Sequence, residues 1–176
     1  MKSAAILFCL VFTLSKAAAQ DAVGSNNTNV WGNAVDGLTV RLVANKKVWT
    51  TNEVPSFRAT VRNNDVKAHG YVTAWQRAGQ LEVDDVWYNW NWGGRGDIGR
   101  GTIYPNHEES SDVTFDPHWI VAKTKESLQI LPGKHTVRFA VEQLTISPLM
   151  TTNIISNPVE IEVKNVGTSI VPTNHN

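Results

Sequence analysis

The residues best suited to chemistry lie in a glycine-rich stretch, residues 93–101, which contains the tripeptide Arg95-Gly96-Asp97. Five of its nine residues are glycine, and glycine accepts the backbone conformations that tight loops need, so we expect an exposed loop. An Arg-Gly-Asp loop can bind a cell-surface receptor, because its cation reaches one receptor subunit and its carboxylate reaches a receptor-held metal ion. The alternative is a glycine-rich hairpin whose charges only keep the loop soluble.

An aromatic run, Trp-Tyr-Asn-Trp-Asn-Trp at residues 87–92, precedes this loop. The two-residue period of a strand places Tyr88, Trp90 and Trp92 on one face and the intervening residues on the other. An exposed row of rings can stack on sugars, with the asparagines as hydrogen-bond partners. The alternatives are that the rings fill the core, because large aromatic side chains bury much apolar area, or that they contact another protein. Trp90 and Trp92 are therefore candidate binding residues whose exposure stays open.

Motifs for catalysis or metal binding are missing from the sequence. It contains no Gly-x-Ser-x-Gly elbow, no EF-hand loop and no His-Glu-x-x-His pair. Triads and carboxylate pairs assemble in space, so the absence of a local signature does not disprove them. We expect a protein that is not an enzyme, with no metal site and no cofactor.

Residues 1–19 have the pattern of a secretory signal peptide. Lys2 supplies the positive start, residues 4–14 are apolar except Thr13, and three alanines at 17–19 form a small-residue cleavage site. The apolar run is shorter than the roughly 20 residues that span a bilayer. We therefore expect a secreted, extracellular protein without a membrane span, whose mature chain begins with the polar segment 20–30.

The composition agrees with secretion and limits the kinds of interaction that can stabilise the fold. The only cysteine, Cys9, lies in the predicted signal peptide, so the mature chain has no disulfide and depends on its core. The chain has 16 basic and 16 acidic residues, and loss of Lys2 and Lys16 leaves a net charge near −2. Such a charge argues against a nucleic-acid partner. Asn26 begins the sequon Asn-Asn-Thr and is the expected glycosylation site.

Apolar residues alternate with polar ones along residues 31–165. The clearest runs are Leu38, Val40 and Leu42; Phe57, Ala59 and Val61; Val137, Phe139 and Val141; and Val159, Ile161 and Val163. Turn residues at 63–65, at Asp84-Asp85 and at Pro132-Gly133 separate such runs. Alternation of Tyr71, Thr73 and Trp75 predicts a further strand, whereas residues 118–127 are expected to hold one helical turn.

This pattern gives about nine short strands and no sustained helical repeat. We therefore predict an all-β domain over residues 31–165, an antiparallel immunoglobulin-like β-sandwich, followed by a flexible tail at 166–176.

Some stretches of the domain have a more specific sequence. They are Trp-Gly-Asn-Ala-Val-Asp-Gly-Leu at 31–38, Leu-Pro-Gly-Lys-His-Thr-Val-Arg at 131–138 and Ser-Asn-Pro-Val-Glu-Ile at 156–161. Together they resemble a β-sandwich module of bacterial extracytoplasmic proteins, notably those of planctomycetes. The resemblance covers residues 31–163 and departs at 90–101. It implies the fold, but no established function and no catalytic motif.

The sequence thus predicts a secreted, non-enzymatic binding or matrix-associated protein that adheres to cells through Arg95, Gly96 and Asp97. One alternative is a carbohydrate-binding module that uses Trp90 and Trp92. Another is a secreted protease inhibitor that offers Arg95 or Arg100 to a trypsin-like pocket. The expected partner is an extracellular protein, a cell-surface receptor or a polysaccharide.

Overall fold

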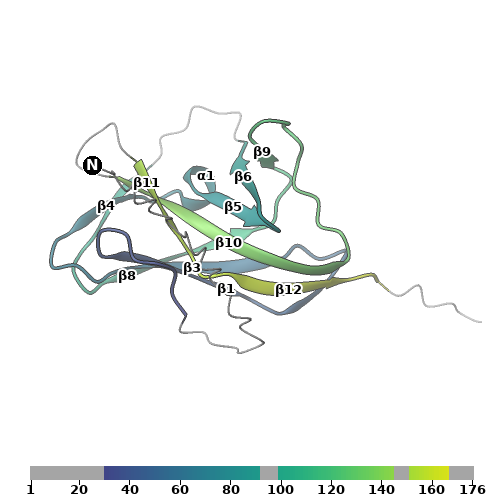
Figure 1. Ribbon diagram of the computed structural model, residues 1–176, viewed down its shortest axis with the longest axis horizontal. Coiled ribbons are helices and arrows are strands. Elements are labelled where there is room, and N and C mark those ends of the chain that lie inside the picture. The colour runs from purple at the N-terminus through teal and green to yellow at the C-terminus, as the bar shows by residue number, and fades with distance from the viewer. Residues whose placement is uncertain (1–29, 92–98, 145–150, 167–176) are drawn as a thin grey trace, which may run out of the picture.

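The computed structural model describes residues 30–91, 99–144 and 151–166, and in these ranges two β-sheets face each other (Figure 1). The elements in chain order are β1 (Leu38–Ala44), β2 (Val48–Thr50), β3 (Ser56–Asn63), β4 (His69–Val72), α1 (Trp75–Ala78), β5 (Gln80–Val83), β6 (Val86–Trp90), β7 (Arg100–Ile103), β8 (Glu108–Thr114), β9 (Trp119–Val121), β10 (Gly133–Leu144), β11 (Thr151–Ile155) and β12 (Val159–Lys164). No helix of the described residues has the length and apolar character needed to cross a membrane.

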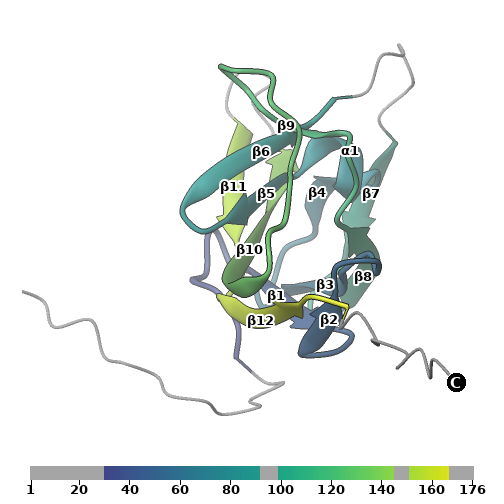
Figure 2. The same cartoon turned by 90° about the vertical axis from the view of Figure 1, so that its right-hand side faces the viewer.

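The smaller sheet has the order β1-β3-β8, and both of its pairings are antiparallel. The larger sheet runs β2-β12-β10-β5-β6-β9, with β4 and β11 also paired to β10 and with β7 paired to β4. Its pairings are antiparallel except for β2 with β12. Figure 2 shows β6, β5, β10 and β11 side by side in the large sheet. The predicted all-β sandwich is confirmed.

The core lies between the sheets and consists of the apolar residues that the alternation predicted. Those of β1, β3 and β10 are fully buried: Leu38, Val40, Leu42, Phe57, Ala59, Val61, Val137, Phe139 and Val141. Trp119 at the start of β9 has no exposed surface and packs edge-on against Phe139 and Trp90. Because one face of each strand is buried, the polar residues between them must face outward.

One local prediction was wrong. The strand expected through Tyr71, Thr73 and Trp75 ends at Val72, and a helical turn begins at Trp75. This turn lets the Trp75 ring pack edge-on against Tyr71 at 6.0 Å between ring centroids. It also brings Gly79 against β10, where an added β-carbon would lie 2.5 Å from the Phe139 ring.

Residues 118–127 contain a strand, β9, and after it the single helical-type turn that the sequence predicted, which is closed by the hydrogen bond from the Lys125 N–H to the Val121 carbonyl at 2.9 Å. Trp119 pairs with Trp90 across the β6–β9 ladder, and its buried ring belongs to the core. Burial of this large aromatic side chain explains why the first part of the segment is a strand.

Residues 30–35, which we name the strap, connect the two sheets at one side. The Gly32 N–H donates to the Val40 carbonyl of β1 at 2.8 Å. A β-carbon at Gly32 would overlap the carbonyl oxygen of Ile155, so only glycine allows the strap to approach β11 this closely. Asp36 and Gly37 then turn the chain with φ of 47° and 80°, which returns it into β1.

Candidate binding surface

The structure describes only Trp90 among the binding residues that the sequence predicted. Trp92, Arg95, Gly96 and Asp97 lie outside the described residues, as does the glycosylation candidate Asn26. Arg100, the second bait candidate for an inhibitor, is exposed at the start of β7 and pairs with Val72.

Trp90 is half-buried, and its ring packs against the core. It meets Trp119 edge-on at 5.1 Å and lies parallel to the His118 ring at 5.2 Å. Partial burial acts to raise the pKa of Asp116, but hydrogen bonds from the backbone N–H and the ring of His118 outweigh it and lower that pKa. The ionised Asp116 thus holds His118 over Trp90, which leaves the Trp90 ring in contact with protein on two sides.

A different set of polar residues faces outward from the large sheet, and we name it the outer face. It consists of Gln80, Glu82, Trp87, Asn89, Arg138 and Asn153, from β5, β6, β10 and β11. The apolar residues that alternate with them, such as Leu81 and Phe139, are fully buried in the core. The register places Glu82 between Trp87 and Arg138, and Gln80 between Asn89 and Ala140. The outer face therefore has two neighbouring rows.

The first row is a chain of side-chain amides across four strands. Asn153 Nδ2 donates to Gln80 Oε1 at 2.8 Å, and Gln80 Nε2 donates to Asn89 Oδ1 at 2.9 Å. Ala140 lies between β11 and β5 in the ladder and has no polar side chain, so the longer amides meet across it. Within the described residues, Asn89 Nδ2 and Asn153 Oδ1 make no further hydrogen bond to the protein. A donor and an acceptor thus end the row.

The second row contains an ion pair between a buried carboxylate and a half-exposed guanidinium, beside an indole ring. Glu82 is only 5% exposed although it points away from the core. Arg138 Nε lies 2.6 Å from Glu82 Oε2, and Arg138 Nη2 donates to Glu82 Oε1 at 3.0 Å and approaches Asp85 at 3.5 Å. A buried carboxylate needs such a partner. Trp87, half-buried on the other side of Glu82, leaves part of its ring at the surface.

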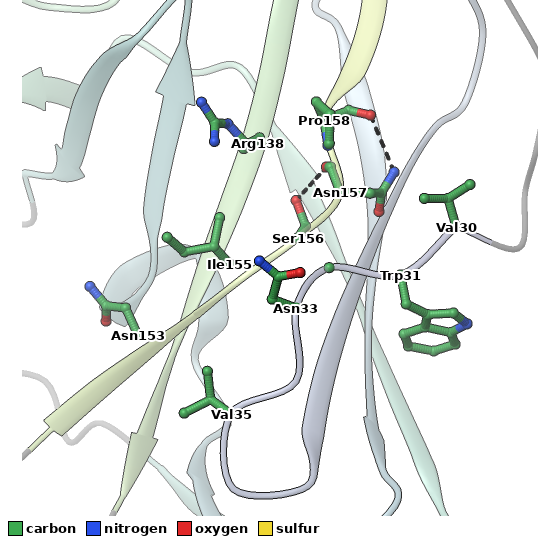
Figure 3. Close-up of a pocket in the computed structure, with 11 residues that line it drawn as sticks. Val30, Trp31, Asn33, Val35, Arg138, Asn153, Ile155, Ser156, Asn157 and Pro158 are labelled. Atoms are coloured by element: carbon green, nitrogen blue, oxygen red, sulfur yellow. Dashed lines mark hydrogen bonds between the residues drawn. The ribbon is translucent and has the colours of Figure 1, made fainter. Parts of the chain in front are cut away.

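The outer face continues into a pocket of about 430 Å³ at the edge strand β11. The strap forms one wall through Val30, Asn33 and Val35, while Asn153, Ile155 and Arg138 form the side that belongs to the sheet (Figure 3). The Trp31 ring points away from the other labelled side chains in this view. It lies instead against two cations, 4.7 Å from the guanidinium of Arg41 and 4.4 Å from that of Arg62.

No group of three or more histidine, cysteine, aspartate or glutamate side chains in the described parts of the chain is placed to hold a metal ion. The surface that the structure does present combines an indole ring, amides and a neutralised ion pair. This chemistry suits hydrogen bonding to a polyhydroxylated ligand together with stacking.

Sequence reasoning placed Trp87 and Asn89 on the face opposite Trp90 but did not name that face as a site. It missed Gln80, Arg138 and Asn153 entirely. The signal that could have found them is the same alternation, because Leu81 and Phe139 in the core imply that Gln80 and Arg138 point outward. Asn153 lies 73 residues from Gln80 in the sequence, and no local pattern predicts that these two side chains meet.

Comparisons with known proteins add little. No family model and no curated protein matches the chain. Among solved structures it is similar to the CARDB domain of a Pyrococcus furiosus protein, with 13% identity, a TM-score of 0.42, and coverage of 73% of this chain and 94% of that one. A crystal structure of that domain in complex with di-metal ions gives 11% identity and a TM-score of 0.43, with 76% and 99% coverage.

A β-glucosidase from Listeria innocua in complex with isofagomine is 13% identical with a TM-score of 0.42, over 72% of this chain but only 16% of the enzyme. These low similarities carry no argument about function.

Proposed function

We propose that the protein is a secreted, non-enzymatic binding module, bacterial and extracytoplasmic as its sequence resemblance implies, and that its ligand is a polysaccharide. The observation that carries the proposal is the outer face, where the Trp87 ring adjoins a row of three hydrogen-bonded amides. An indole ring offers an apolar surface to the C–H face of a sugar, and amides pair with its hydroxyl groups.

The amide row is organised before any ligand binds. Gln80 is held from both sides by Asn153 and Asn89, so its rotamer is already restricted. A side chain that is ordered in the free protein loses less entropy on binding. The donor on Asn89 and the acceptor on Asn153 lie at opposite ends of the row, and each can pair with a different hydroxyl group of a sugar chain, because a hydroxyl both donates and accepts.

The charges on the outer face favour a neutral polysaccharide over an acidic one. Arg138 is the cation of this face, and its guanidinium contacts Glu82 and Asp85. Further along the same outward side, Glu160 and Glu162 of β12 are accompanied by Lys134, opposite Glu162, and by Lys164, which pairs with Glu162. An acidic sugar would therefore have to compete with Glu82 and Asp85 for Arg138.

Retention on insoluble polysaccharides tests this proposal. Cellulose, chitin and xylan serve as neutral probes, and Trp87→Ala is expected to lower the affinity for the retaining polysaccharide by at least about tenfold, or ~1.4 kcal/mol. Tyr104→Ala is the control, because it removes an exposed aromatic ring that lies outside both the outer face and the pocket. Wild-type affinity in a folded Trp87→Ala protein would contradict the proposal.

Cell adhesion through Arg95, Gly96 and Asp97 is a second candidate, supported by how the ends of that segment are held. The Asn91 N–H donates to the His118 carbonyl at 2.7 Å, and the Thr73 N–H donates to the Gly99 carbonyl at 2.8 Å. A loop between two fixed ends can present a tripeptide at low entropic cost. Loss of cell attachment in Asp97→Glu, with unchanged polysaccharide retention, would support this candidate; attachment equal to wild type would reject it.

A further inference from the structure

The strap ends the outer face at its β11 side. Its backbone at Gly32 is in contact with the backbone of Ile155, and it is tied to β1 by the hydrogen bond from Gly32 to Val40. Asn33 and Val35 of the strap line the same pocket as Ile155 and Arg138 (Figure 3). A ligand that follows the amide row from β6 toward β11 therefore meets a wall at this pocket.

The pocket suits a single sugar residue in size and chemistry. Its volume of about 430 Å³ lies in the range of small-molecule sites. Val35 and Ile155 supply apolar surface, and Ile155 is 38% exposed although it is a large hydrophobic residue. Asn33 and Asn153 supply amide groups on opposite sides. An apolar lining with a few polar groups is what orients a ligand in such a site.

The pocket and Trp87 are separated by a short oligosaccharide length. Arg138 lines the pocket and lies in one register row with Glu82 and Trp87, so two strand spacings of about 4.8 Å give about 10 Å from Arg138 to Trp87. Asn153 lines the pocket and also begins the amide row. One ligand can therefore occupy the pocket and reach the indole at once.

We propose that the pocket accepts the terminal residue of the polysaccharide chain, so that the module recognises chain ends rather than chain interiors. This inference rests on the proposed function, because the rest of the chain lies on the outer face. An interior residue would require the polymer to continue through the wall that the strap forms against β11.

The test uses whichever of cellulose, chitin and xylan retains the protein. Limited acid hydrolysis of that polysaccharide increases the number of chain ends while its mass stays constant. We expect the amount of full-length protein bound at saturation to rise in proportion to the ends. Two variants fill the pocket, Ile155→Trp from β11 and Asn33→Trp from the strap. Each is expected to lower affinity at least tenfold, and Asn33 is exposed, so its variant is expected to fold. Ile155→Val is the control and should bind as wild type.

A saturation level that does not change with the number of ends would overturn chain-end recognition, as would wild-type affinity in the folded Asn33→Trp protein. In both cases Trp87→Ala still reports on the outer face by itself. If Trp87→Ala lowers affinity while the filled pocket does not, the proposed function stands and this inference fails. If the wild type binds none of the three polysaccharides, both fail.

Discussion

The side-chain amide of Asn157 pairs with both backbone groups of Leu42, which lies 115 residues earlier in the chain. The Leu42 N–H donates to Asn157 Oδ1 at 2.9 Å, and Asn157 Nδ2 donates to the Leu42 carbonyl at 3.2 Å. Next to it, Ser156 exchanges hydrogen bonds with the backbone of Phe139 in the large sheet. These two residues therefore join β1 of one sheet to β10 of the other.

Asn157→Ala is expected to destabilise the protein by about 2–4 kcal/mol, because it leaves a buried donor and a buried acceptor unpaired. Leu42 is only 1% exposed, so water cannot replace the lost bonds. Urea unfolding of the variant measures the effect. The control is Asn45→Ala, which removes an exposed hydrogen bond to Ser56 and should change stability by less than about 0.5 kcal/mol. Equal stability of the two variants would contradict the assigned role.

This pairing also explains what the sequence could and could not predict. Strand positions such as Leu38, Val40 and Leu42 were predictable because a strand with one buried face must alternate. The stretches at 31–38 and 156–161 carried the family resemblance, and the structure uses them to join the sheets through Gly32, Ser156 and Asn157. The contacts that join the two sheets therefore explain the residue types at these positions.

The site was less predictable than the fold, for a physical reason. Alternation gives the face of a strand, but it does not give the neighbours of that strand in the sheet. Gln80 meets Asn89 through a local hairpin, whereas it meets Asn153 only because β5 and β11 both pair with β10. The helical turn at Trp75 escaped prediction for a similar reason, since it packs Trp75 against Tyr71 and Gly79 against Phe139 of β10, and no local pattern predicts the contact with β10.

Truncation of Trp87 is expected to lower the free energy of unfolding less than truncation of Trp90. Trp90→Ala removes a ring packed on Trp119 and should cost about 2–3 kcal/mol of stability, less than the ~3–5 kcal/mol of a fully buried ring. Trp87→Ala removes a ring from the outer face and should cost about 1 kcal/mol or less. Urea unfolding measures both values, provided that the free energy of unfolding falls with urea concentration at the same slope in both variants. A larger loss for Trp87→Ala than for Trp90→Ala would reverse the assignment of the two faces.

Gly32→Ala is expected to displace the strap, because the new methyl group would overlap the Ile155 carbonyl oxygen. Such overpacking typically costs about 1–3 kcal/mol. Hydrogen exchange should show faster exchange of the residue 32 amide, which donates to Val40 in the wild type. Ala34→Ser, at an exposed strap position, is the control. Wild-type protection of residue 32 in Gly32→Ala would show that the strap tolerates a side chain there.

Glu53 gives the protein an acid-sensitive contact beside Trp49. The Lys46 ammonium, the Thr50 N–H and the Thr50 hydroxyl all donate to its carboxylate, and together they lower its pKa from 4.5 to about 2. The Lys46 ammonium also lies 4.5 Å from the centre of the Trp49 ring. Protonation of Glu53 therefore loosens a turn that packs on a core residue.

A group with a lowered folded-state pKa stabilises the protein above its unfolded pKa, and this contribution is lost as the pH falls through the folded pKa. Wild type should therefore be more stable than Glu53→Gln above pH 4.5, and the difference should shrink as the pH falls from 4.5 toward 2. Urea unfolding of both proteins across this range measures the difference. Glu126→Gln is the control, because within the described parts of the chain its carboxylate accepts only from the exposed Thr124 hydroxyl. A difference that stays constant with pH would show that the Glu53 carboxylate is not held by these donors in solution.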